Sequence, residues 1–188
     1  PTLLSLLDTC ATSMGTRWLR HALHHPLCDR SAAGHRHAAV GELMEGAAET
    51  ARRVLRGVSD IERITARVAL RSARPRDLSA LRDSIGRLAE LRAALGTPQA
   101  PLLVRMLEEL ATPEESLDLL VRAIAPEPST VLRDGGVIAE GFDADLDELR
   151  GIQTNCGAFL LELEARERER TAIANLKAEI NRVHGSYI

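Results

Sequence analysis

Aromatic residues are scarce in this sequence, and its cysteines and apolar runs form no recognisable pattern. Phe, Trp and Tyr together make up 2% of the 188 residues, which disfavours a large β-sheet and favours helices. The three cysteines, Cys10, Cys28 and Cys156, form no CxxC pair, so we expect a reduced, cytosolic protein without a disulfide framework or zinc ribbon. No apolar run approaches ~18 residues and no signal peptide is visible, so no membrane partner is expected.

Lysine is nearly absent as well. Lys177 is the only lysine among 24 basic residues, and the formal net charge is −3. This charge excludes a globally basic nucleic-acid binder, although a local basic patch is compatible with it. No GxxxxGK[ST] phosphate-binding loop occurs, and no arrangement of serine, histidine and acid suggests a nucleophile. We therefore predict that this chain is not an enzyme and holds no cofactor or metal.

The longest helical pattern covers residues 143–171 and contains no proline. Asp143 is placed to cap its start. Its second half is almost entirely charged, with pairs such as Glu164 and Arg168 at helical spacing. Such a helix would extend ~43 Å at ~1.5 Å per residue, so we expect a rod that starts in a core and projects from it. Its first half carries an apolar stripe to be buried, formed by Leu146, Leu149, Ile152, Cys156, Phe159, Leu160 and Leu163.

Before this pattern, apolar residues at helical spacing are interrupted by proline and glycine, which predicts a bundle of shorter helices. Residues 130–139 place β-branched residues on both sides of Asp134-Gly135-Gly136, which predicts a β-hairpin. The tail has the pattern of one further strand. The predicted fold is therefore mainly α: a multi-helix bundle with one long protruding helix and a small β-hairpin. The expected divisions are 1–125 for the bundle, 126–171 for the connection, hairpin and long helix, and 172–188 for the strand.

Histidines and acidic residues offer two candidate metal sites, each with a simpler interpretation. Five histidines have spacing that can hold a metal, but they lie in arginine-rich turns, and a solvated helix face explains them better. Acidic residues at the start of the long helix lack the glycine and closing glutamate of a calcium loop, so we interpret them as charges that favour a helix N-terminus. The two groups are His21, His24, His25, His35 and His37, and Asp143, Asp145, Asp147 and Glu148.

An arginine stripe lies at helical spacing in the first half of the chain. Arg63, Arg67 and Arg71 recur every four residues and would share one helix face. They could meet phosphates or the acidic surface of a partner. Pairing with acids of the same chain, such as Glu62, Asp77 or Asp83, is the interpretation that we favour.

Four stretches form a specific set when they are taken in order: LLSLLDTCATSMGTRWLRHAL with PLCD after it, VSDIERITARVALRSARPRDLSAL, RDGGVIAEGFDADLDELR, and LEARERERTAIANLKAEINRVHGSYI. Together they cover essentially the whole chain and resemble the core domain of the MutS family of DNA mismatch-repair proteins. Two positions depart from the family pattern. Ser13 stands where proline is frequent, and Ser186 stands where an aromatic residue is common.

The resemblance implies an α-helical core whose long lever helix runs out to a DNA clamp. Residues 126–142 would connect the bundle to the lever, and residues 172–188 would begin the clamp. The family's Phe-x-Glu mismatch-reading motif, its ATPase and its helix-turn-helix end do not occur here; the only phenylalanines are Phe142 and Phe159. Because the chain begins at Pro1 and stops within a pattern, we expect it to be a piece of a larger protein.

The function that the resemblance implies is a structural and allosteric lever segment, which couples an ATPase to the DNA clamp in mismatch repair. The parent protein would bind ATP and Mg²⁺, form a homodimer, and meet mismatched double-stranded DNA, other MutS domains and a MutL-type repair partner in the bacterial cytoplasm, at the nucleoid. Two alternatives are a helical coiled-coil adaptor that self-associates through residues 146–163 and a module that binds the DNA backbone without reading bases. The backbone contacts would be Lys177, Asn181, Arg182 and His184.

Overall fold

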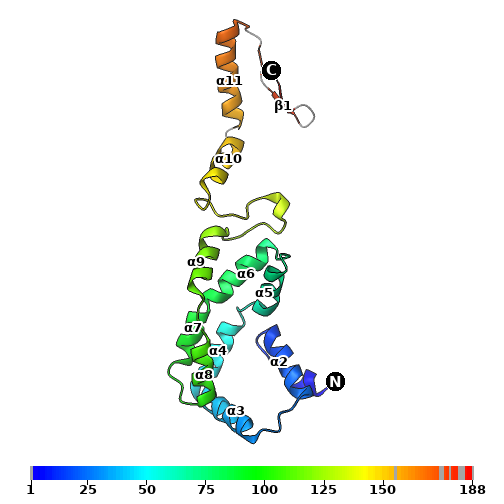
Figure 1. Ribbon diagram of the computed structural model, residues 1–188, viewed down its shortest axis with the longest axis vertical. Helices are drawn as coiled ribbons and strands as arrows, with labels where there is room; N and C mark the ends of the chain where they lie inside the picture. Colours follow the sequence, from blue (N-terminus) through cyan, green and yellow to red (C-terminus); the bar gives the residue numbers. More distant parts are fainter. Residues whose placement is uncertain (1, 155, 174–175, 178, 182–184, 188) are drawn as a thin grey trace. The chain divides into compact units, whose positions relative to one another are not determined.

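The chain, seen as a computed structural model, is mainly α-helical, which confirms the predicted fold class (Figure 1). It divides into two compact units, Pro1–Ala139 (unit 1) and Glu140–Ile188 (unit 2), which are described one at a time. The described residues are 2–154, 156–173, 176–177, 179–181 and 185–187.

Unit 1 consists of short helices whose starts follow local sequence rules. The side chains of Thr12, Asp29 and Asp60 each accept a hydrogen bond from a backbone N–H in the first turn of the helix that follows. Pro75 and Pro101 occupy first helical positions, where the missing N–H costs nothing. The helices are α1 (Leu3–Leu7), α2 (Ser13–His24), α3 (Arg30–Glu42), α4 (Ala48–Leu55), α5 (Ile61–Ala69), α6 (Pro75–Gly86), α7 (Leu88–Leu95), α8 (Pro101–Glu109) and α9 (Glu114–Ala123).

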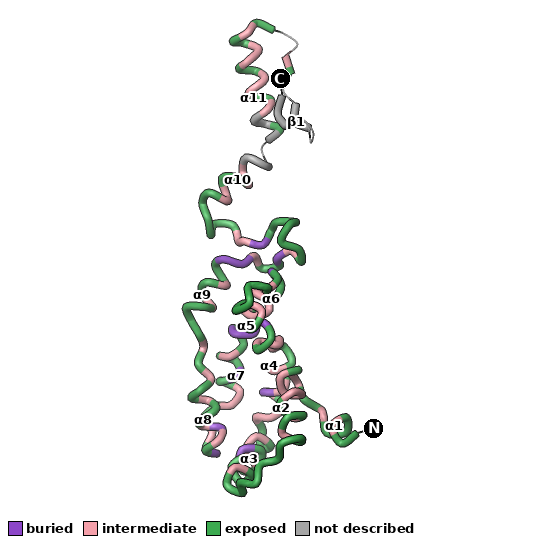
Figure 2. The backbone as a smooth tube through the Cα atoms, turned by 45° about the vertical axis from the view of Figure 1, so that its right-hand side comes forward, coloured by how far each residue is buried: buried purple, intermediate pink, exposed green. Residues whose placement is uncertain are grey.

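Two small apolar clusters form much of the core of unit 1. In the first, α3 packs on α8, and in the second, α4 packs on α7. A π-helical turn, Leu43–Ala47, separates α3 from α4, and the chain kinks there at Gly46, whose φ of 155° suits glycine. The described buried residues all belong to unit 1 (Figure 2). The buried members are Ala39, Ala100 and Leu103 in the first cluster and Ala51, Val54 and Leu91 in the second.

Charged side chains from neighbouring helices form hydrogen bonds with the backbone at several helix ends in unit 1. The Glu42 carboxylate, at the end of α3, accepts hydrogen bonds of 2.8 and 2.6 Å from the two backbone N–H groups just before α8. Arg92 of α7 donates to two carbonyls at the other end of α8, both at 2.7 Å. Arg82 of α6 donates to three successive carbonyls, 124–126, at the end of α9. Some of these bonds satisfy backbone groups that a helix leaves unpaired at its ends, and the others bind the chain directly beside the helix.

Residues 130–139 do not form the predicted β-hairpin. Leu132–Asp134 make one turn of 3₁₀ helix. Ile138 forms an isolated antiparallel bridge with Ile124, which follows α9, and a backbone hydrogen bond of 2.9 Å lies on each side of it. The partner of this segment is therefore the chain after α9 and not the residues before the turn. As a result unit 1 extends to Ala139, beyond the expected division at residue 125.

Unit 2 begins with two helices, α10 (Ala144–Thr154) and α11 (Cys156–Thr171), which together cover the predicted long helix. Asn155, between them, lies outside the described residues. The Asp143 side chain accepts a hydrogen bond of 2.9 Å from a backbone N–H of the first turn, so the predicted cap is confirmed.

The apolar stripe of the long helix is less covered than its spacing predicts. Leu149 is 63% exposed, and Leu146, Leu160 and Leu163 are only half-buried. The expectation of a buried first half is therefore wrong at Leu149. Helical spacing identifies which face is apolar, but it does not supply a partner for that face. The other stripe side chains, those of Ile152, Cys156 and Phe159, lie outside the description.

The end of α11 is joined to the tail by one arginine. The predicted pair of Glu164 and Arg168 is present at 2.8 Å, and Arg168 also donates a hydrogen bond of 2.8 Å to the carbonyl of Leu176. The tail contains two short strands, β1 (Glu179–Asn181) and β2 (Gly185–Tyr187), which pair with each other in antiparallel fashion. The prediction of one continuous strand is therefore wrong, because the tail supplies its own partner.

Replacement of Glu42 by alanine tests whether its carboxylate stabilises the start of α8. The change leaves two N–H groups at the helix start without their acceptor, and we expect a loss of about 1–2 kcal/mol in the free energy of unfolding. Urea unfolding followed by circular dichroism measures it. Glu45→Ala, at an exposed glutamate in the adjoining turn, is the matched control and should change stability little. Equal losses in the two variants would contradict the role of Glu42.

Candidate functional site

The residues proposed to contact a nucleic-acid backbone lie in the tail of unit 2. Lys177 is exposed and directly follows Leu176, whose carbonyl is held by Arg168. Asn181 ends β1, where its backbone pairs with Gly185. Arg182 and His184 lie outside the described residues, and so does the side chain of Asn181. The structure therefore places one candidate cation, Lys177, on an exposed segment next to a strand pair.

The histidines of unit 1 do not assemble into a metal site. Among the described residues, no group of three or more His, Cys, Asp or Glu side chains is arranged to hold a metal ion. His21 and His25 instead stack, with ring centroids 4.4 Å apart. The Nδ1 atom of His25 lies 3.1 Å from the carbonyl oxygen of His21, which places it within hydrogen-bond distance. One end of α2 is thus occupied by a local ring contact.

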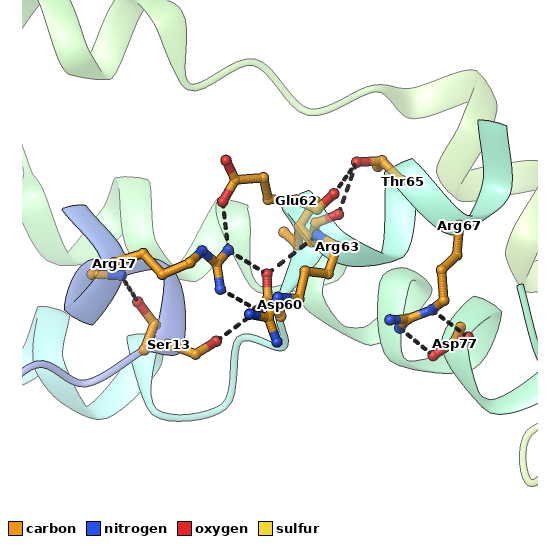
Figure 3. Close-up of polar contacts among 11 residues, drawn as sticks. Ser13, Arg17, Asp60, Glu62, Arg63, Thr65, Arg67 and Asp77 are labelled. Carbon is orange, nitrogen blue, oxygen red and sulfur yellow. Dashed lines mark hydrogen bonds and ion pairs between the residues drawn. The ribbon is translucent and has the colours of Figure 1, made fainter. Parts of the chain in front are cut away.

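Two arginines of the stripe, Arg63 and Arg67, form ion pairs with acidic residues of the same chain. Arg67 forms a two-pronged ion pair with Asp77, with hydrogen bonds of 2.9 and 2.6 Å (Figure 3). Arg63 Nε lies 3.6 Å from Asp60. Arg71 adopts a positive φ of 53° just after α5 and is exposed. Intrachain pairing, the favoured interpretation of this stripe, is confirmed for Arg67 with the predicted partner Asp77.

A second arginine network, which the sequence did not reveal, centres on Asp60. Arg17 of α2 donates hydrogen bonds of 2.6 and 2.7 Å to the two oxygens of the Asp60 carboxylate, and it also pairs with Glu62 (Figure 3). Ser13 Oγ donates a third hydrogen bond of 3.0 Å to Asp60. The same carboxylate caps α5 by accepting from the backbone N–H of Arg63 at 3.2 Å. Asp60 therefore joins α2 to the start of α5.

The electrostatics of both networks follow from these pairs. The hydrogen bonds from Arg17 hold the pKa of Asp60 well below its ordinary value and raise the pKa of the Arg17 guanidinium. The hydrogen bonds from Arg67 likewise lower the pKa of Asp77. Both carboxylates therefore stay ionised at neutral pH. Groups held in one charge state suit structural cross-links better than proton transfer.

There is a physical reason why the sequence did not reveal the network around Asp60. Asp60 is recognisable as a helix cap from its position before an apolar-periodic segment. Arg17, however, lies 43 residues away, and no local spacing rule connects two residues so distant. The Arg67 and Asp77 pair was accessible to sequence reasoning because its members flank a single turn and are 10 residues apart.

A cavity of about 620 Å³ in unit 1 has a lining that does not point to one reaction or ligand. Its lining includes two arginines, Arg76 and Arg87, and two carboxylates, Asp83 and Glu127, so its charges balance. Asp83 is also paired with Arg82 at 2.9 Å. The rest of the lining is serine, proline, alanine and glycine. These groups can bind water or small polar molecules, but they do not form a nucleophile with its base.

The acidic residues at the start of α10 act on the helix itself. Asp143 caps the helix, and Asp147 accepts a hydrogen bond of 2.7 Å from the backbone N–H of Gly141. Asp147 also pairs with Arg150 at 3.1 Å. These contacts are those of carboxylates at a positive helix end, which is the interpretation that we preferred to a calcium site.

Comparison with protein-family models matches residues 1–187 to MutS domain III. The match includes both units, and the chain therefore belongs to the MutS domain III family, a part of MutS-type mismatch-recognition proteins. This confirms the resemblance seen in the four sequence stretches. As for membranes, no helix in the described part of the chain has both the length and the apolar character to span one.

Replacement of Asp77 by asparagine tests the pair with Arg67. Asparagine can still accept the hydrogen bond that caps α6, so the change removes mainly the ion pair. Because Arg67 is 40% exposed and screened by solvent, we expect a loss of only about 0.5–1 kcal/mol. The pKa of Asp77 is lowered in the folded state, so this stabilisation is complete above the ordinary value of 3.8 and is lost as the pH falls below it.

The measurement is urea unfolding of the native chain and the variant at about pH 6 and at successively lower pH. The difference in unfolding free energy should shrink to zero as Asp77 is protonated in the native chain. Asp83→Asn, at a carboxylate that is 60% exposed on the same helix, is the control and should have the smaller effect. A difference between native and Asp77→Asn that does not depend on pH would rule out the ion pair as its source.

Proposed function

We propose that this chain is a non-catalytic lever segment of a MutS-type protein, which couples an ATPase to a DNA clamp in mismatch repair. The observation that carries the proposal is the joint at Arg168, where the end of α11 is tied to the segment that leads into β1 and β2. A helix whose far end is bonded to the next element can pass on a displacement.

The start of the lever supports the same proposal. Asp143 caps α10, and Asp147 binds the backbone of Gly141 just before the helix, so the first turn is bonded to the chain that enters it. In this proposal α10 and α11 move together, so that a small rotation at the base of α10 becomes a larger displacement at the tip of α11. Charged pairs within α11, such as Arg170 with Glu167 at 2.7 Å, stabilise the helix at helical spacing.

The remaining parts of the proposal come from family membership. Other MutS domains would supply the ATPase with its ATP and Mg²⁺, and the parent protein would act as a homodimer on mismatched double-stranded DNA with a MutL-type partner. Its setting would be the bacterial cytoplasm, at the nucleoid. In this proposal the present chain contributes mechanical coupling and no catalytic group.

Replacement of Leu160 by proline in the full-length protein tests the lever. Leu160 lies inside α11, where proline removes a backbone hydrogen bond and clashes with the preceding turn, at a cost of about 3 kcal/mol or more. We expect ATP hydrolysis and mismatch binding to persist while ATP-driven release from DNA is lost. Release is measured by surface-immobilised mismatched DNA after ATP is added.

Leu160→Ala is the matched control, because it removes the same side chain but keeps the helix. It should release DNA at the native rate. Normal release by Leu160→Pro would show that coupling does not pass through α11. Loss of release in both variants would assign the effect to the leucine side chain and not to the rigidity of the helix.

A second candidate function, direct binding of the DNA backbone, is favoured by the exposure of Lys177 next to the paired strands. An exposed cation can contact a phosphate without reading a base. Against this candidate stands the net charge of −3, which repels DNA from the chain as a whole.

A salt titration of the chain with duplex DNA separates the two functions. If the tail binds phosphates, binding should weaken linearly on a logarithmic salt scale, and Lys177→Gln should lower the slope by about one. Because Lys177 is the only lysine, amine-selective acetylation gives an independent test through protection by bound DNA. Arg133→Gln, at an exposed arginine of unit 1, is the control. Absence of binding at low salt would exclude direct DNA binding by this chain, and the lever function would remain as the single candidate.

A further inference from the structure

The first two helices contribute little to the apolar core of unit 1. Neither α1 nor α2 has a buried residue among those described, and neither supplies a member to the two apolar clusters. Both helices are nevertheless well formed, since α1 has a capping box at Thr2 and α2 is capped by Thr12. The stability of each helix and its attachment to the rest of unit 1 are therefore separate questions.

Charged groups provide the attachment that the core does not. Arg17 binds Asp60 through two hydrogen bonds and pairs with Glu62, and Ser13 binds the same carboxylate (Figure 3). Farther along, Arg52 of α4 donates a hydrogen bond of 2.7 Å to the backbone carbonyl of residue 9. A further contact between α2 and α3 is the Arg36 guanidinium over the Trp18 ring, 5.0 Å from its centroid. Apart from the hydrogen bond from Ser13, each of these contacts uses an arginine.

The segment between α2 and α3 has the features of a hinge. Residues 25–29 form no helix or strand, and each of them is exposed. Pro26 lies within this segment and prevents α2 from continuing. With few packing contacts of its own, the segment can change its backbone angles without disturbing either neighbouring helix.

We propose that residues 2–25 form a hinged arm, latched to the start of α5 by Arg17, Asp60 and Glu62, which undocks as one piece while α3 to α9 stay folded. The pair of Arg17 and Asp60 is partly buried, since the Asp60 side chain is 19% exposed and that of Arg17 is 32% exposed, whereas Glu62 is 71% exposed. Partial burial strengthens the pair relative to a surface ion pair but leaves it open to competing ions.

The charges around the latch determine what can open it. Arg17 and Arg63 face Asp60, Ser13 donates to it, and Glu62 shares Arg17 with it. Because the pKa of Asp60 lies well below its ordinary value, protonation releases the latch only in strong acid. Ionic competition for Arg17 is therefore the trigger that acts near neutral pH, either by salt or by an anionic group of a partner.

Hydrogen exchange of the chain, read by mass spectrometry, tests the arm. Asp60→Asn removes the charge but keeps a residue that caps helices well, so α5 should remain capped. Once undocked, α2 is a helix of 12 residues without tertiary support, and such a short helix frays in water. We therefore expect amide exchange in α2 to accelerate by ~10-fold or more, while exchange in α6 and α7 is unchanged. Asp29→Asn, the same change at the cap of α3, is the matched control and should not accelerate exchange in α2.

The native chain provides a second measurement that does not depend on a variant. Between about 0.05 M and about 0.5 M NaCl, exchange in α2 should rise and exchange in α6 should not. Acceleration of all helices together in Asp60→Asn would overturn the proposal, because the arm would then unfold with the whole unit. Unchanged exchange in α2, in the variant or at high salt, would overturn it too, because the latch would not be what holds the arm.

Discussion

Unpaired backbone groups at helix ends are the constraint on which unit 1 depends. A helix leaves four N–H groups and four carbonyls without partners inside itself, and a unit made of many short helices has many such ends. Local caps satisfy some of them. Others are satisfied by charged side chains from other helices: Glu42 at the start of α8, Arg92 at its end and Arg82 at the end of α9. These bonds also fix how the helices pack.

The composition of the chain suits this arrangement. Its two apolar clusters are built partly from alanines, which bury little area, so packing alone positions the helices weakly. An arginine carries five donors in a planar fork and can serve several acceptors at once. Arg82 uses this capacity on three carbonyls and one carboxylate. The near absence of lysine, which has no such fork, thereby gains a structural interpretation.

Sequence reasoning succeeded where a signal is local and failed where it is not. The helical class, the cap at Asp143 and the Arg67–Asp77 pair each rest on neighbouring residues. The hairpin at residues 130–139 was wrong because Gly135 and Gly136, with φ values of 72° and 67°, make a turn whose returning segment pairs with the end of α9. Likewise, the pairing of Arg17 with Asp60 depends on how helices pack, which no local pattern contains.

Helix α8 is held at its start by a carboxylate from α3 and at its end by a guanidinium from α7. Its position therefore does not depend on the peptide that joins it to α7, where Gly96 turns the chain with a φ of 62°. The order in which the helices follow one another is thus partly independent of how they pack. A break in the chain at Thr97 would accordingly leave α8 bound to unit 1 at both of its ends.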